Sequence, residues 1–170
     1  MRKLRPYLLL QAASLASFIA GSATFIATPW LALEVSKSST ISAIIIAITA
    51  IPALVLTPFV GGLIDRYGRR RMAIWLEIVT FFTTAAIPIA AMTIGMNVGT
   101  LILFATIKTI FQPGTVTARK SLLPDVCDAS GITLDRANSI GEAVSAAGFA
   151  IGPAIAAVCI GSYGINSAYW

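Results

Sequence analysis

The sequence lacks histidine altogether and contains only two cysteines. Without histidine, histidine-based acid–base catalysis and most zinc sites are excluded. Cys127 falls in a predicted loop and Cys159 in a predicted helix, so neither a disulfide framework nor a metal site is supported. Because no nucleophile–base pair, metal-ligand cluster or phosphate-binding loop is found, we expect no enzyme activity, no cofactor and no bound metal.

Charge is also scarce in this sequence. Charged residues make up 11% of the chain, against roughly 25% in an ordinary soluble domain. Hydrophobic residues make up 57%, which predicts an all-α integral membrane protein. The net charge of +5 could suggest a nucleic-acid partner. We expect none, because the arginines lie in short loops between apolar runs and not on a basic face with interleaved aromatics.

Apolar runs long enough to span a bilayer occur five times, and a sixth begins near the end of the chain. A hydrocarbon core of about 30 Å needs about 20 apolar residues per helix. The first run exceeds the roughly 7–15 residues of a signal-peptide core, so we expect it to span the membrane. The aromatic pair Tyr169 and Trp170 is typical of the membrane interface at the start of another helix. These features predict that the chain is the N-terminal half of a larger membrane protein. The predicted helices cover about residues 7–33, 42–64, 72–94, 100–120 and 139–160.

The basic residues fall on one side of these predicted helices. With the N-terminus inside, Lys37 lies outside, Lys108 lies within the membrane, and every other basic residue is cytoplasmic. The positive-inside rule therefore predicts a cytoplasmic N-terminus and cytoplasmic loops over 65–71 and 122–138. The cytoplasmic set is Arg2, Lys3, Arg5, Arg66, Arg69, Arg70, Arg71, Arg119, Lys120 and Arg136.

Lys108 is the one charge predicted near the middle of the membrane. With Gln112, Thr115 and Arg119 it forms a polar stripe at spacings of four, three and four. A lysine at the bilayer centre costs at least about 3 kcal/mol on insertion scales, so it should face a cavity or a partner. No acid is predicted at the same depth, which favours substrate binding or proton coupling for Lys108 and Gln112 over a structural role.

Gln11 and Glu77 are further candidates for substrate binding or proton coupling. Gln11 borders a helix face of small and hydroxyl residues, which either packs closely against another helix or lines a polar cavity. Glu77 lies about one and a half turns inside its helix. We expect it to reach back to the arginines of the preceding turn, the alternative being a snorkelling or paired acid at the membrane interface. The face beside Gln11 comprises Ser14, Ser17, Gly21, Thr24 and Thr28.

In the run over 139–160, one helix face consists of residues with small side chains, at spacings of four, three, four and four. Such a face suits close helix packing, and we expect it to contact a helix of a missing C-terminal half. Pro153 should kink or weaken this helix. The small residues are Gly141, Ser145, Gly148, Gly152 and Ala156.

The turn between the second and third runs carries a recognisable motif. It matches at every position the pattern G-x-L-x-D-R-x-G-R-[RK], and the chain thereby resembles the major facilitator superfamily, which has this loop between helices 2 and 3. The matching residues are Gly61, Leu63, Asp65, Arg66, Gly68, Arg69 and Arg70.

Further motifs resemble one branch of that superfamily. Gly148, Gly152 and Pro153 are similar to the G-x-x-x-G-P-x-x-G-G motif of drug–proton antiporters, with alanines in place of the final glycines. Lys108 stands near the arginine of their R-x-x-Q-G motif, with Gln112 shifted by one residue. The segment 119–153 looks most similar to macrolide-efflux and enterobactin-exporter proteins.

The resemblance implies a twelve-helix fold in two six-helix halves, with substrate bound between them near mid-membrane. This chain would supply the first five helices and a stub of the sixth. It would be a multi-pass protein of a cell membrane, the bacterial inner membrane, with the lipid bilayer, a small-molecule substrate and a C-terminal transmembrane half as partners. The Asp65 turn would act as a gating loop that holds the cytoplasmic side closed.

The function implied is secondary active, proton-coupled efflux of drugs or siderophore-like compounds by alternating access. Two alternatives stay open. One is uptake of a small metabolite. The other is a truncated membrane interaction protein that does not transport.

Overall fold

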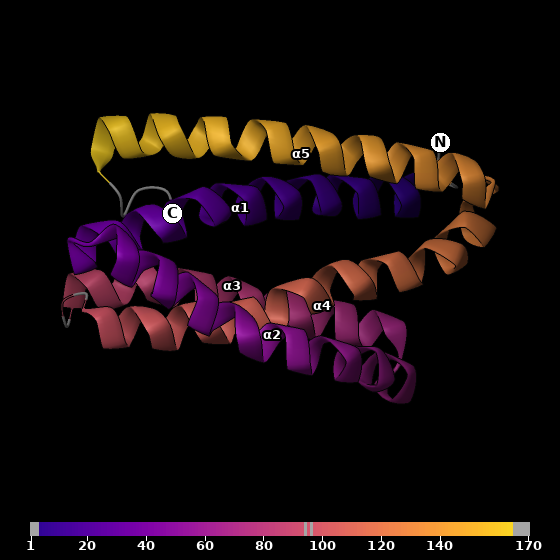
Figure 1. Ribbon diagram of the computed structural model, residues 1–170. Helices are drawn as coiled ribbons and strands as arrows, with labels where there is room; N and C mark the ends of the chain where they lie inside the picture. Colours follow the sequence, from indigo (N-terminus) through magenta and orange to yellow (C-terminus); the bar gives the residue numbers. More distant parts are fainter. Residues whose placement is uncertain (1–3, 94, 96, 165–170) are drawn as a thin grey trace.

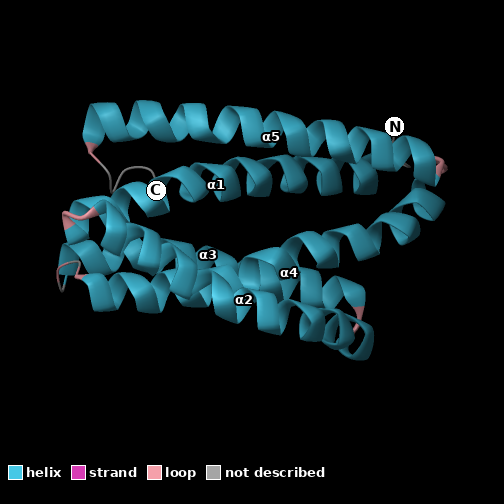
Figure 2. Cartoon of the chain, in the orientation of Figure 1, coloured by secondary structure: helices cyan, strands magenta, loops and turns pink. Residues whose placement is uncertain are grey.

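The computed structural model describes residues 4–93, 95 and 97–164, and this part of the chain forms α-helices joined by short connections, with no strand (Figure 2). Each helix is long and apolar enough to cross a membrane. The predicted stub of a sixth helix falls mainly on residues 165–170, outside the described residues. The helices are α1 (Arg5–Ser36), α2 (Ser39–Tyr67), α3 (Arg69–Thr93), α4 (Val98–Ser130) and α5 (Leu134–Tyr163).

Local signals explain where the helices begin and end. The Ser38 side chain caps α2 by accepting a hydrogen bond from the Ile41 N–H. Asn97 and Thr100 form a reciprocal capping box at the start of α4. At Gly68 the backbone turns with φ of 91°, a conformation that favours glycine, so α2 passes into α3 within a single residue.

The predicted loop over 122–138 is instead largely helical. The helix α4 continues to Ser130 and α5 begins at Leu134, so only three residues join them. The sequence prediction was wrong here because charge and hydropathy report depth in the membrane, not helicity. At 1.5 Å per residue, α4 is about 50 Å long, well beyond a hydrocarbon core of about 30 Å. Its end packs through Cys127 against Tyr7 and Ala137.

The helices run alternately up and down, so the N-terminus, the α2–α3 turn and the α4–α5 turn lie at one end of the bundle (Figure 1). The helices α1 and α5 lie side by side, while α2, α3 and α4 form a second group. The last part of α4 bends away from α2 and α3 toward α5 (Figure 1). Because α4 contacts each of the other four helices, it connects the two groups.

Two apolar clusters hold α2, α3 and α4 together. Near the start of α2, Ile45 packs with Ile87 and Leu101. Near the α2–α3 turn, Ile64 packs with Leu76 and Ala118. Much of the remaining apolar surface is exposed, including Leu54 at 77% and Phe25 at 72%. Such a surface is suited to lipid and not to water.

Candidate functional site

A cavity of about 450 Å³, lined by apolar and polar residues, lies between α1, α3 and α4. The helix α1 contributes small and hydroxyl residues, α3 contributes an acid and threonines, and α4 contributes the predicted polar stripe. The polar residues and the one glycine that line it are Ser17, Gly21, Thr24, Glu77, Thr80, Thr84, Lys108, Gln112 and Thr115. The stripe predicted from spacing on α4 therefore does face a cavity, over its Lys108, Gln112 and Thr115 positions.

Lys108 is the central charge of this region. It is 6% exposed and also lines a second cavity, of about 200 Å³, between α1, α2 and α4. Thr24 and Gln112 border both cavities. Among the described residues Lys108 forms no ion pair. A buried ammonium without an acid partner is costly, so its position between two cavities marks it as a candidate ligand-binding group.

Glu77 pairs with Arg119 of α4, not with the arginines of the turn as predicted. Because α3 and α4 are antiparallel, a residue near the start of α3 lies level with a residue well along α4. The Arg119 side chain is 7% exposed and Glu77 38% exposed. Ser17 donates a 3.4 Å hydrogen bond to Glu77 Oε1, and the Arg119 guanidinium lies 5.6 Å from the Phe18 ring centroid. This ion pair joins α1, α3 and α4 at the edge of the cavity.

Thr80 and Thr84 are cavity residues that the sequence predictions missed. Together with Glu77 they follow spacings of three and four, which place them on one face of α3. The Thr80 hydroxyl is buried and has no hydrogen-bond partner within the described part of the chain. Lys108 is therefore the cavity's candidate ligand-binding cation, whereas the Thr80 oxygen itself is shielded from the cavity.

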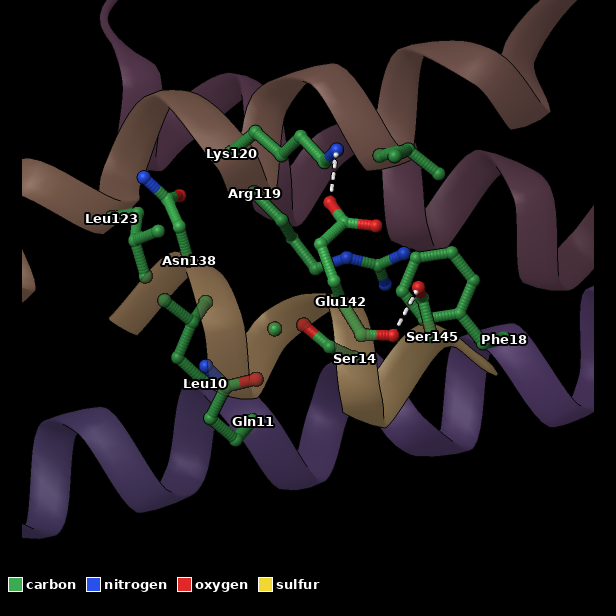
Figure 3. A pocket seen from close by; sticks show the side chains of 12 residues that line it. Leu10, Gln11, Ser14, Phe18, Arg119, Lys120, Leu123, Asn138, Glu142 and Ser145 are labelled. Carbon is green, nitrogen blue, oxygen red and sulfur yellow. Dashed lines mark hydrogen bonds and ion pairs between the residues drawn. The ribbon is translucent and has the colours of Figure 1, made fainter. Parts of the chain in front are cut away.

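Gln11 lies in a different place from Lys108. It lines a small pocket of about 50 Å³ between α1, α4 and α5, shown in Figure 3. Its amide donates a 3.0 Å hydrogen bond to the Tyr7 hydroxyl. On the other side of this pocket, Lys120 and Glu142 pair at 3.1 Å and link α4 to α5 (Figure 3). The substrate role predicted for Gln11 stays a prediction, outside the Lys108 cavity.

The small and hydroxyl residues on one face of α1 serve both roles that the sequence left open, close helix packing and the lining of a cavity. Thr24 and Thr28 donate hydrogen bonds to carbonyls of their own helix, and both line a cavity. Gly21 serves close packing, because a Cβ there would lie 2.8 Å from the Gln112 amide nitrogen. The missing side chain at Gly21 therefore lets Gln112 sit against α1.

The glycine face of α5 packs against α1, not against a helix of a second half as predicted. A Cβ at Gly148 would lie 2.5 Å from the Phe18 Cβ, and one at Gly152 would overlap Ser22. The Ser22 hydroxyl donates a 2.9 Å hydrogen bond to the Gly148 carbonyl. The two helices approach this closely because the glycines carry no side chain. Pro153 follows within the same helix, and its predicted kink stays a prediction.

The predicted gating loop lies at the end of the bundle that carries the N-terminus (Figure 1). Arg69 and Asp125 form an exposed 3.4 Å ion pair that ties the start of α3 to α4. Arg66 lies over the Tyr67 ring, 5.7 Å from its centroid.

Asp65 is exposed and makes no ion pair within the described ranges. Gly61 is also uncrowded, since no described atom lies within 4 Å of an added Cβ. Arg70 is exposed as well.

Five long apolar helices define a multi-pass membrane protein, and three of them, α1, α3 and α4, line the cavity that contains Lys108. The sequence pattern of the Major Facilitator Superfamily matches residues 11–170, so the chain belongs to this superfamily. This membership confirms the predicted superfamily and the all-α membrane fold. Together with the five apolar helices, it agrees with the predicted multi-pass protein of a cell membrane.

The chain is similar to curated multidrug efflux pumps. It is 33% identical over 168 residues to the multidrug efflux pump Tap of Mycolicibacterium fortuitum. The aligned segment covers 97% of this chain and 41% of that protein. It is 31% identical to the Tap pumps of Mycobacterium bovis and Mycobacterium tuberculosis, again over 97% of this chain and 40% of theirs. The chain thus spans about two fifths of the length of these relatives. No solved structure gave a significant match.

Proposed function

We propose that this chain is the N-terminal part of a secondary active exporter of drug-like small molecules. The observation that carries the proposal is its similarity to the Tap multidrug efflux pumps along 97% of its length. In such a fold, two halves rock about a central site that opens alternately to each side. This chain contributes the cavity between α1, α3 and α4 to that central site.

Within the cavity, Lys108 binds an anionic or hydrogen-bond-accepting group of the substrate. Its burial without an ion pair among the described residues supports this role. Gln112, which lines the same cavity, supplies further hydrogen bonds. Phe81 lines the same cavity and is 68% exposed, so it offers an aromatic surface for the apolar part of a drug.

Proton coupling is assigned to the Glu77 carboxylate. It borders the cavity, where a proton can reach it, and it is paired with the buried Arg119. A proton on Glu77 removes the negative charge that stabilises Arg119 and favours a change of partner by the guanidinium. The ion pair therefore converts proton binding into a rearrangement between α3 and α4.

Gating is assigned to the α2–α3 turn. Asp65 is exposed without an ion pair within the described residues, so its carboxylate is available to the positive N-terminus of a helix in the C-terminal half. The Arg69–Asp125 ion pair holds the turn against α4. Contacts of this kind stabilise the outward-facing state and break when the cytoplasmic side opens.

The test is a transport assay on the protein expressed from its complete reading frame in a bacterial strain without its main efflux pumps. Cells are preloaded with a panel of fluorescent dyes, and initial loss is measured with and without a protonophore. Export that the protonophore abolishes supports the proposal. Accumulation would instead support metabolite uptake, and no movement of any dye would support a non-transporting interaction protein.

A further inference from the structure

A second site lies away from the substrate cavity, in a groove between the end of α2 and the start of α3. The groove has a volume of about 400 Å³ and is lined by Leu63, Tyr67, Arg71, Met72 and Trp75. We propose that this groove binds an anionic phospholipid, with the headgroup phosphate on Arg71 and an acyl chain along the apolar lining. The ligand is a membrane lipid, so the site is independent of what the protein transports.

The first support is charge. Arg71 is exposed and makes no ion pair within the described part of the chain, whereas its neighbour Arg69 already pairs with Asp125. The nearest acids along the chain are Asp65 and Glu77, each six residues from Arg71. Glu77 pairs with Arg119, and Asp65 is two residues from both Leu63 and Tyr67. Two residues correspond to about 200° around a helix, so Asp65 lies on the opposite side of α2 from the groove. The groove therefore presents an uncompensated guanidinium, which binds phosphate with bidentate geometry.

The second support is the mixture of apolar and aromatic lining. Leu63 and Tyr67 are one turn apart on α2, and Arg71 and Trp75 are one turn apart on α3, so each helix presents a stripe to the groove. Tyr67 and Trp75 are 55% and 53% exposed. Trp75 is held by an edge-to-face contact with Phe111, with ring centroids 6.1 Å apart. Aromatic rings of this kind lie at the level of lipid headgroups.

The third support is position. The groove lies beside the α2–α3 turn, at the end of the bundle that also carries the N-terminus and the α4–α5 turn (Figure 1). The distribution of basic residues predicts that this end is cytoplasmic. Anionic lipids attract basic groups at the cytoplasmic leaflet, and basic pockets between helices bind their headgroups. A soluble acidic peptide would match Arg71 but not the apolar stripe beneath it.

The experiment is native mass spectrometry of the detergent-purified protein, expressed from its complete reading frame. The added ligands are phosphatidylglycerol, phosphatidylcholine of the same acyl chains, or inorganic phosphate. Arg71→Gln removes the guanidinium, Arg71→Lys retains the charge, and Trp75→Ala shortens the apolar wall. Arg136→Gln is the matched control, because Arg136 is an exposed arginine at the same end without an ion pair in the described part of the chain.

We expect the wild type to retain phosphatidylglycerol in preference to phosphatidylcholine. Arg71→Gln should weaken phosphatidylglycerol binding about fivefold, the contribution of one basic residue near an anionic surface. Trp75→Ala should weaken it too. Arg71→Lys should lose part of it, because an ammonium keeps the charge but not the bidentate geometry, while Arg136→Gln retains most of it. Equal losses in Arg71→Gln and Arg136→Gln would overturn the proposal, since charge alone would then account for binding. Equal retention of inorganic phosphate, or of both lipids, would overturn it as well. Because no arm measures transport, the result does not depend on the proposed export.

Discussion

At the scale of single residues, Lys108 gives the sharpest test of substrate binding. Lys108→Met keeps the length of the side chain and removes its charge. A hydrogen bond to a charged group contributes about 1.5–3 kcal/mol, so we expect the initial export rate at low substrate to fall about tenfold or more. Membrane expression should not fall, because burying an uncharged side chain is less costly. Export kinetics equal to wild type, measured with the same dyes, would reject the role of Lys108.

Glu77 and Arg119 test whether a buried ion pair stabilises the bundle. Arg119 is 7% exposed, so Glu77→Gln leaves a nearly buried cation without its acid. Glu77 is 38% exposed, so Arg119→Met leaves a carboxylate that water can still reach. We expect a larger loss of thermal stability in Glu77→Gln than in Arg119→Met.

The double variant Glu77→Gln/Arg119→Met provides the control for this pair. Its loss should be smaller than the sum of the single losses, because residues in direct contact couple. Thermal unfolding of the three variants in detergent measures the coupling. Additive losses would mean that the ion pair contributes nothing to stability.

Residue spacing predicted some of this site and missed the rest for a physical reason. The stripe containing Lys108 and Gln112 was found because periodicity on one helix fixes which residues share a face. The partner of Glu77 was assigned wrongly, because spacing along α3 does not tell which helix lies opposite. Arg119 is 42 residues away in the chain, yet the antiparallel packing of α3 and α4 makes it the neighbour.

At the scale of helices, the contact between α1 and α5 depends on Gly152. An added Cβ would lie 2.5 Å from the Ile19 carbonyl oxygen and 2.9 Å from the Ala23 nitrogen. Both are backbone atoms, which cannot rotate away. We expect Gly152→Leu to separate the helices and to lower stability by at least the roughly 1–3 kcal/mol typical of overpacking.

Gly161→Leu is the matched control on the same helix. No described atom lies within 4 Å of a Cβ added at Gly161. Fluorescence-detected size-exclusion chromatography after heating should show a lower midpoint for Gly152→Leu and an unchanged midpoint for Gly161→Leu. Equal midpoints for the two variants would show that the close approach of α1 and α5 is not required.

Helix positions were more predictable than helix partners. Apolar runs predict a span because the bilayer requires a continuous apolar length. The small residues on one face of α5 correctly predicted close helix packing, but they did not predict the packing partner. In the sequence, nothing distinguishes Phe18 and Ser22 of α1 from residues of a helix outside this chain. The helical segment Ser121–Ser130 was missed because its charges exclude it from lipid without excluding it from a helix.

At the scale of the whole molecule, the fold gathers the basic turns at one end. The α2–α3 turn with its arginines and the α4–α5 turn lie beside the N-terminus (Figure 1). Charge predicts that this end is cytoplasmic, and that orientation stays a prediction. The fold also leaves Asp65 exposed, as the proposed gating contact with a C-terminal half requires.

Asp65→Asn tests that gating role, because it removes one charge while preserving shape. Asp65 has no ion pair to lose within the described residues, so the helical fold and membrane insertion should be unaffected. Loss of its contact with a helix N-terminus in the other half should abolish export. Asp128→Asn is the control, since Asp128 is another exposed acid at the same end of the bundle. Normal export by Asp65→Asn, at equal amounts of inserted protein, would mean that the carboxylate only shapes the turn. Loss of export in both variants would mean that the negative charge of this surface matters and not the particular contact of Asp65.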